Sequence, residues 1–251
     1  MAQRVVEWSK RWQLNLSEPK CQVLHITNRR QVANFNYSIN NSDLENTKMV
    51  KDLGFYVSKN LKFSDHCQRI SAKALRIAAL IFRVFRTRKS AILLRAYKAY
   101  VRPIVESGSS VWNPHLCKDI DIIEKVQRYF TRRLFYRCRL PMLSYTERLN
   151  FLELETLEKR RVKTDLILCY KIKNGLVDLD FNKFFQIRER QSRGHSSILH
   201  VKSSRINARK NFFANRVVNQ WNKLSEDQIT ARSVGIFKHK LSVSERGLRF
   251  V

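Results

Sequence analysis

Residues 64–90 read SDHCQRISAKALRIAALIFRVFRTRKS, and this stretch decides the fold from which the rest of the chain can be read. Apolar side chains recur in it at helical spacing, which predicts an amphipathic helix over residues 64–86. They are Ile70, Ala74, Ile77, Ile81 and Val84. Cations recur on another side of this helix at offsets of four, three and seven residues; they are Arg69, Lys73, Arg76 and Arg83. One face is therefore expected to pack, and a neighbouring face to carry a row of positive charge.

The basic row lies in a strongly basic region. Residues 64–105 hold ten Lys or Arg and a single acid, Asp65. Such a helix repels itself in isolation, and phosphates lying along it are the best explanation, because each neutralised phosphate releases condensed counterions. The alternative is a solvated basic face with no ligand.

Composition extends the charge argument to the whole chain. The formal net charge is +28, from 49 Lys+Arg against 21 Asp+Glu in 251 residues. A field of this sign steers a protein toward nucleic acid or an anionic membrane. The hydrophobic fraction of 43% is ample for a packed core, so a basic disordered tail is excluded, and the length allows one large or two small domains.

The sequence predicts an intracellular protein without a membrane span. Its most apolar stretch, residues 77–82, is flanked by arginines and is far shorter than the ~20 residues that a span needs. Residues 1–12 carry charges where a signal peptide needs an apolar core. The five cysteines contain no C-x-x-C pair, so reduced thiols are expected rather than a disulfide framework or a zinc site.

The remaining periodicities predict an α+β fold that is predominantly α. A helix over residues 4–12 is followed by three β-branched and aromatic stretches, which predict a small antiparallel sheet. These stretches are residues 22–26, 35–39 and 50–57. Helices are then expected over residues 64–86, from Ser90 to a kink or end at Pro103, and over residues 119–134, 145–152, 155–173, 211–224 and 234–241. Residues 186–209 lack periodicity and are expected to form an exposed basic loop or linker.

Motifs for catalysis or metal binding are weak. Asp119 and Asp121 form a D-x-D, but they stand at a helix start, where capping is a better explanation than a divalent cation. The histidines show no metal-ligand spacing, and no G-x-S-x-G or phosphate-binding loop occurs. A second basic row, formed by Lys125, Arg128 and Arg132, follows the predicted helix over residues 119–134. Aromatic residues beside these cations could stack on bases, yet most are expected in the core, so nucleic-acid binding is inferred from charge.

Several runs resemble reverse transcriptases of non-LTR (LINE-type) retrotransposons. The run WSKRWQLNLSEPKCQVLHI, residues 8–26, resembles the segment that follows the catalytic aspartates, and VKDLGFYVSKNLKF, residues 50–63, resembles the primer grip. Residues 97–115 and 120–134 are similar to thumb helices, and residues 144–175, 193–201 and 209–224 to the stretch after the thumb. The likeness spans nearly the entire chain in order.

This resemblance implies the end of the palm over residues 1–63 with a primer-grip-like hairpin, a helical thumb over residues 64–140 and a helical post-thumb region over residues 141–251. The Tyr-x-Asp-Asp turn of that family is missing from the sequence. Without its carboxylates the two Mg²⁺ ions of the polymerase have no ligands, so this chain alone is expected to bind no cofactor and to be inactive. Mg²⁺ is expected only in a full-length polymerase.

The resemblance also assigns site residues. Lys20 matches a lysine thought to approach the departing pyrophosphate, and Leu53 and Gly54 match the primer grip, where glycine permits close backbone approach. Gly54 serving only the geometry of a hairpin is an equal alternative. The nucleic-acid-binding candidates on the helices are Arg69, Lys73, Arg76, Arg83, Lys98, Arg102, Lys125, Arg128 and Arg132.

The expected partners are RNA, an RNA–DNA or DNA duplex, and the missing N-terminal polymerase part, and no membrane is expected. The sequence does not determine the oligomeric state. As a ribonucleoprotein the chain would be found in nucleus and cytoplasm. Two alternatives remain: a non-catalytic nucleic-acid-binding protein derived from such an element, and a basic helical module that meets acidic proteins.

Overall fold

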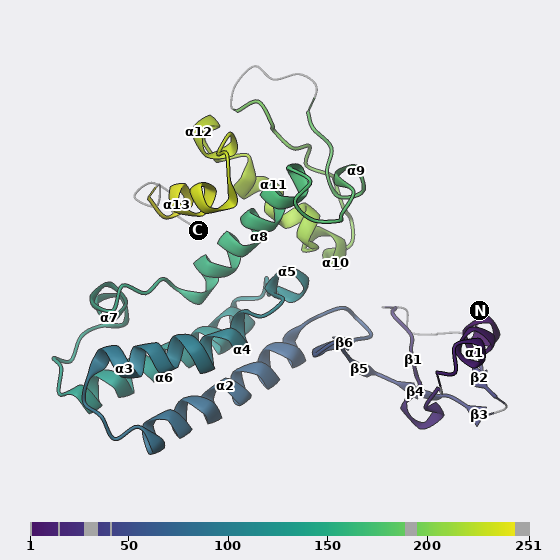
Figure 1. Cartoon of the computed structure of the whole chain (residues 1–251), viewed down its shortest axis with the longest axis horizontal. Coiled ribbons are helices and arrows are strands. Elements are labelled where there is room, and N and C mark those ends of the chain that lie inside the picture. The colour runs from purple at the N-terminus through teal and green to yellow at the C-terminus, as the bar shows by residue number, and fades with distance from the viewer. Residues whose placement is uncertain (1, 15, 28–34, 41, 189–194, 244–251) are drawn as a thin grey trace. The chain divides into compact units, whose positions relative to one another are not determined.

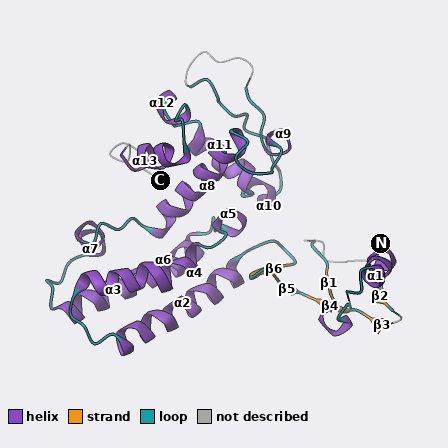
Figure 2. Cartoon of the chain, viewed as in Figure 1, coloured by secondary structure: helices purple, strands orange, loops and turns teal. Residues whose placement is uncertain are grey.

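The chain forms two compact units, which are described separately below (Figure 1). The computed structural model describes residues 2–14, 16–27, 35–40, 42–188 and 195–243. The first unit is Met1–His66 and the second is Cys67–Val251. Among these residues, all the strands belong to the first unit, and helices make up most of the second (Figure 2). The expected α+β class, predominantly α, is confirmed.

Three separate strand pairs follow helix α1 (Ala2–Arg11) in the first unit. Strand β1 (Gln22–Leu24) pairs with β4 (Glu45–Thr47) in parallel. The pairs β2 (Ser38–Ile39) with β3 (Ser42–Asp43), and β5 (Met49–Asp52) with β6 (Phe55–Ser58), are antiparallel. The prediction of one small antiparallel sheet was therefore wrong. Strand β4 reads Glu-Asn-Thr and carries no apolar signal, so its pairing with a strand more than 20 residues away could not be read locally.

His66 lies in an aromatic cluster at the end of the first unit. Its ring centroid is 5.7 Å from that of Phe55, 6.2 Å from Tyr56 and 6.3 Å from Phe63. Its Nδ1 accepts a hydrogen bond from the backbone N–H of Tyr56 at 3.4 Å. Burial lowers the pKa of His66 to about 4, so the imidazole is neutral at physiological pH.

The second unit begins with helix α2 (Ser64–Val84) from Cys67 onward and continues with α3 (Ser90–Ala96), the π-helical turn η2 (Tyr97–Val101), α4 (Arg102–Glu106), α5 (Ser109–Trp112) and α6 (Cys117–Cys138). The π turn ends at Val101, two residues before Pro103, which stands in the first turn of α4. A proline lacks its N–H, and the wider turn before it accommodates that loss, so the helical path does not end there.

Helices α2 and α6 lie side by side and run in the same direction (Figure 1). Near their ends, the rings of Phe82 and Phe130 lie 4.8 Å apart, and Arg137 Nη2 donates to the carbonyl oxygen of Phe82 at 2.5 Å. Near their starts, the charge of Asp119 acts on Cys67, whose pKa is raised mainly by burial. The starts of the two helices lie together and so do their ends, so α2 and α6 form a parallel pair.

The apolar stripe of α2 packs as predicted except at its last residue. Ile70, Ala74 and Ile81 are buried and Ile77 is half-buried, whereas Val84 is 63% exposed. Each residue turns an α-helix by about 100°, so Val84 lies about 20° around the helix from Ile77, seven residues earlier. It therefore stands at the edge of the stripe nearest the cations. Placing Val84 in the core was wrong.

The rest of the second unit packs around α8. The helices are α7 (Tyr145–Phe151), α8 (Leu157–Lys173), α9 (Phe181–Phe184), α10 (Asn207–Lys210), α11 (Phe213–Trp221), α12 (Glu226–Ile229) and α13 (Val234–Val243). Tyr170 of α8 stacks on Phe237 of α13 at 4.4 Å, and Trp221 of α11 packs against the same ring at 6.2 Å. These three rings belong to one buried cluster that joins α8, α11 and α13.

The predicted basic loop over residues 186–209 is partly anchored. His195 Nε2 donates to the carbonyl oxygen of Trp221 at 3.2 Å, and the indole Nε1 of Trp221 donates to the carbonyl oxygen of Ser197 at 3.0 Å. Leu199 is buried in the same cluster. An exposed linker is therefore wrong for residues 195–199, since polar contacts hold them without any periodic pattern; residues 189–194 lie outside the described part.

Among the described residues, no helix has both the length and the apolar character required to cross a bilayer. All five cysteines are free thiols, as expected.

Candidate nucleic-acid interface

The cation row of α2 is exposed along its whole length. Arg69, Lys73, Arg76 and Arg83 are all solvent-exposed, and on a regular helix they fall within an arc of roughly 80° opposite the buried stripe. The row is about 21 Å long, at 1.5 Å per residue. Asp65, in the first turn, is the one acid of α2, and residues 67–84 contain no Asp or Glu.

Helix α6 carries the second row on the side opposite its core. Lys125, Arg128 and Arg132 are exposed, while Phe130 and Leu134 of the same helix are fully buried. The spacing of three and four residues predicted this row, and all three of its side chains are exposed.

Helix α7 supports the second row from one side. The guanidinium of Arg128 lies 5.1 Å above the ring of Tyr145, whose hydroxyl donates to Glu124. Glu124 also accepts a hydrogen bond from the backbone N–H of Leu157 at 3.0 Å, which ties α6 to α8. Burial raises the pKa of Glu124 despite these hydrogen bonds. The network fixes the rotation of α6 and so the direction of its cations.

Each row lies on the solvent side of its own helix. Tyr97 of η2 packs on Phe130 at 4.7 Å and donates to Gln127 at 2.7 Å, so η2 lies against the buried side of α6. The cations of both helices are on the sides away from their buried residues. Arg133 of α6 lies 5.5 Å above the ring of Phe82 on α2. Sequence reasoning missed Arg133, although the Arg-Arg doublet at residues 132–133 signalled it.

Lys98 and Arg102 are placed elsewhere. They stand on η2 and α4, where they line a cavity with residues of α8 and α13. Arg102 Nε is 3.6 Å from Glu106 Oε2. The structure does not bring these two candidates together with the rows on α2 and α6.

The first unit holds the candidates Leu53, Gly54 and Lys20. Leu53 and Gly54 form the two-residue turn of the β5–β6 hairpin, with φ of 44° and 91°. Leu53 is 90% exposed at the tip, in a left-handed conformation that is costly for leucine. A Cβ on Gly54 would meet nothing within 4 Å, so the turn alone accounts for glycine. Lys20 is exposed at the end of a 3₁₀ turn, Glu18–Lys20.

Neither Asp119 nor Asp121 stands at the N-cap position of α6. The N-cap position is Leu116, with no side-chain hydrogen bond, and Asp119 is buried in the first turn. Asp121 faces solvent, 3.9 Å from Arg128. Neither residue is the N-cap, because the helix begins at Cys117, two residues earlier than the pattern suggested; Asp119 still lies in the first turn, where the helix dipole favours a carboxylate. Within the described residues, no group of three His, Cys, Asp or Glu side chains could hold a metal ion.

Comparison with known proteins found a relative in Caenorhabditis elegans. The chain is 27% identical over 126 residues to uncharacterized protein B0403.1 of Caenorhabditis elegans, a match that covers 50% of this chain. The chain spans 64% of the length of that relative. No family model and no solved structure matches the chain.

Proposed function

We propose that the exposed surface of α2 and α6 binds the sugar-phosphate backbone of a nucleic-acid duplex, RNA or RNA–DNA, without sequence choice. The observation that carries this proposal is the α2 row: four exposed cations in one arc, on a segment without an acid. Its length of about 21 Å corresponds to about six phosphates of one strand, at 3.4 Å each.

The proposal includes an origin for the chain. The resemblance of its segments supports the palm-end, thumb and post-thumb portion of a non-LTR retrotransposon reverse transcriptase. In this proposal the chain does not polymerise by itself, because the sequence lacks the Tyr-x-Asp-Asp carboxylates that would hold Mg²⁺. Asp121 does not replace them, since its side chain faces Arg128. Primer extension on poly(rA)/oligo(dT) with Mg²⁺ is expected to give no product, and measurable extension would contradict this part.

Charge reversal on α2 tests the interface. The triple variant Lys73→Glu, Arg76→Glu and Arg83→Glu removes three exposed cations that have no ion-pair partner among the described residues. We expect its affinity for an A-form RNA duplex, measured by fluorescence anisotropy, to fall about 100-fold or more, because each phosphate contact is lost and replaced by repulsion.

A matched control separates a shaped surface from net charge. Arg205, Lys223 and Arg232 are also exposed, and their reversal to Glu changes the net charge by the same amount. This control should lose less than about fivefold in affinity. Equal losses in both triples would show that α2 is no specific interface.

A non-catalytic nucleic-acid-binding protein, retained after the enzyme decayed, is the second candidate, and the missing carboxylates favour it. A module for acidic proteins is distinguished by competition. Heparin would displace any ligand of a generic charge patch as well as a duplex does, whereas a duplex-shaped surface prefers the A-form duplex.

A further inference from the structure

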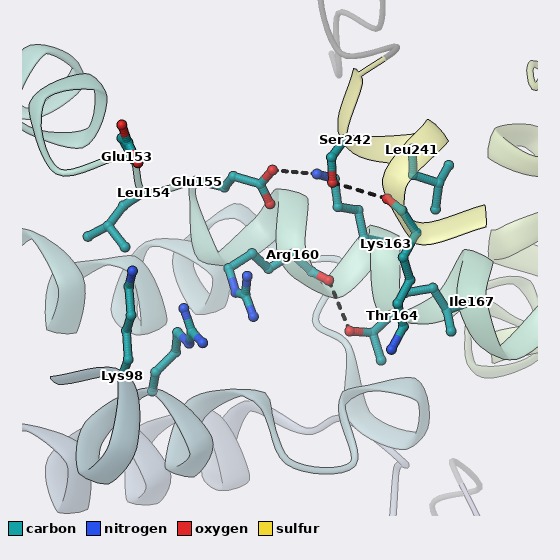
Figure 3. Close-up of a pocket in the computed structure, with 12 residues that line it drawn as sticks. Lys98, Glu153, Leu154, Glu155, Arg160, Lys163, Thr164, Ile167, Leu241 and Ser242 are labelled. Carbon is teal, nitrogen blue, oxygen red and sulfur yellow. Dashed lines mark hydrogen bonds and ion pairs between the residues drawn. The ribbon is translucent and has the colours of Figure 1, made fainter. Parts of the chain in front are cut away.

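A second basic site lies on another part of the second unit. A cavity of about 530 Å³ is bounded by η2 and α4, by the connection from α7 to α8, by α8 and by α13 (Figure 3). Five cations line it, against two acids, Glu153 and Glu155. The cations are Lys98, Arg102, Arg160, Lys163 and Lys238. The volume is in the range of small-ligand sites and too small to admit a double helix.

Three of the five cations are held by carboxylates. Arg160 makes two hydrogen bonds to Glu106, with its Nη2 at 3.0 Å from Oε2, and Arg102 lies 3.6 Å from the same carboxylate. Lys163 is paired with Glu155 (Figure 3). These pairs fix the wall of the cavity, and the hydrogen bond to Glu106 raises the pKa of Arg160.

The other two cations have no carboxylate partner in the described part of the chain. Lys98, on η2, and Lys238, on α13, are exposed and line the cavity together with the paired cations. With Glu106 counted beside the two lining acids, five cations face three carboxylates, so two positive charges remain in excess and the two ammonium groups are unmatched. A multiply charged anion would satisfy both.

The other lining side chains narrow the ligand class. Thr164 Oγ1 donates to the carbonyl oxygen of Arg160, and Ser242 Oγ to that of Lys238, so both hydroxyl protons are already engaged. The lining residues include no aromatic side chain on which a base could stack. The cavity thus offers cationic donors without a platform for a nucleobase.

We infer that this cavity binds a compact polyphosphate group, separately from the duplex surface on α2 and α6. Two sources share that chemistry: a free polyphosphate and the 5′-triphosphate end of an RNA strand. Lys98 and Lys238 supply the contacts to the anion, while Arg160 and Lys163 are positioned by their carboxylates and strengthen the field.

Isothermal titration of the full chain with inorganic tripolyphosphate tests this site. We expect saturable binding by the wild-type chain, weakened about tenfold or more for each cation removed in the double variant Lys98→Glu and Lys238→Glu. The control double variant, Arg205→Glu and Lys223→Glu, has the same net charge and should bind as the wild type does. Thermal melts confirm that each variant folds.

Two results would overturn the inference: no saturable binding by the wild-type chain, or equal weakening in both double variants. The triple variant of α2 distinguishes this inference from the proposed duplex interface, because it should lose affinity for the duplex and keep its affinity for tripolyphosphate. A single-stranded RNA with a 5′-triphosphate, compared with its 5′-hydroxyl form, assigns the source. Tighter binding of the triphosphate form supports an RNA end, and equal binding of the two forms supports a free polyphosphate.

Discussion

The arginines and lysines of α2 and those around α8 have different surroundings. Along α2 the cations face solvent on a segment that contains no carboxylate. Around α8 they are joined to acids: Arg216 donates to both oxygens of Asp165, at 2.9 and 3.1 Å, and to the carbonyl oxygen of Ser110 at 2.6 Å. The same side-chain chemistry therefore holds helices together in one region and is left available to a partner in the other.

This difference separates stability from binding. A paired, partly buried cation is costly to disturb because its partner is left without compensation, whereas an exposed row of like charges adds repulsion to the folded state. Substitutions near α8 should therefore lower the free energy of unfolding, and substitutions on α2 should change binding while leaving stability almost unchanged.

The largest expected effect is on the Arg216–Asp165 pair. Asp165→Ala removes a buried carboxylate that also accepts a hydrogen bond from Asn113 Nδ2 at 3.2 Å. We expect the free energy of unfolding, measured by urea denaturation, to fall by about 3–5 kcal/mol. The control Asp121→Ala, at an exposed acid 3.9 Å from Arg128, should cost less than about 1 kcal/mol. Similar losses in the two variants would remove the distinction between the regions.

The next effect concerns a titratable side chain that the fold keeps neutral. The pKa of His66 is lowered to about 4 by burial, from an unfolded value of 6.5. As the pH falls, the unfolded chain therefore takes up a proton at His66 before the folded chain does. The contribution of the neutral imidazole to the free energy of unfolding is complete above pH 6.5 and is lost as the pH falls toward 4, by about 1 kcal/mol per pH unit.

His66→Gln should reduce the pH slope of unfolding between pH 6.5 and 4, measured by urea denaturation at several pH values. His195, whose pKa burial also lowers, contributes with the same sign in both proteins and cancels in the comparison. An unchanged slope in His66→Gln would show that this imidazole protonates equally in both states.

A smaller gain is expected at the hairpin tip. Leu53 adopts φ of 44° and is 90% exposed, so its side chain contributes little packing to offset the left-handed backbone. Leu53→Asn should raise the free energy of unfolding of the first unit by about 0.5–1 kcal/mol, measured by amide hydrogen exchange in β5 and β6. A loss of protection there would mean that the leucine makes a stabilising contact.

The smallest expected effect is the change in the free energy of unfolding when the cations of α2 are neutralised. The variant Lys73→Gln, Arg76→Gln and Arg83→Gln should unfold within about 0.5 kcal/mol of the wild type, since these side chains are exposed. A large loss of stability would show that the row supports the fold.

Much of the helical part could be predicted from sequence, because it depends on local period. The helix predicted over residues 64–86 is Ser64–Val84, and that predicted over residues 155–173 is Leu157–Lys173. Exposure of the α2 row followed from the same period. Lys98 and Arg102 could not be placed, since their surroundings depend on how η2 and α4 pack against α8, which no local pattern encodes.

The misses share one physical reason. Strand β4 (Glu45–Thr47) pairs with a strand distant in sequence, and Leu199 is buried beside Trp221 through polar contacts of its neighbours. Arg161 is fully buried on α8, with its Nε donating to Asn113 at 3.0 Å, although an arginine reads as a surface residue. Each of these positions is determined by tertiary contacts rather than by propensity or spacing.

The salt dependence of duplex binding tests the proposed role of α2 most directly. The slope of log K against log salt concentration counts the phosphates that the protein neutralises, at about 0.9 per phosphate for a double helix. The neutral triple variant of Lys73, Arg76 and Arg83 should lower the magnitude of that slope by roughly two to three, while neutralising Arg205, Lys223 and Arg232 should leave it unchanged. A slope equal to that of the wild type in the α2 variant would show that no phosphate lies along this helix.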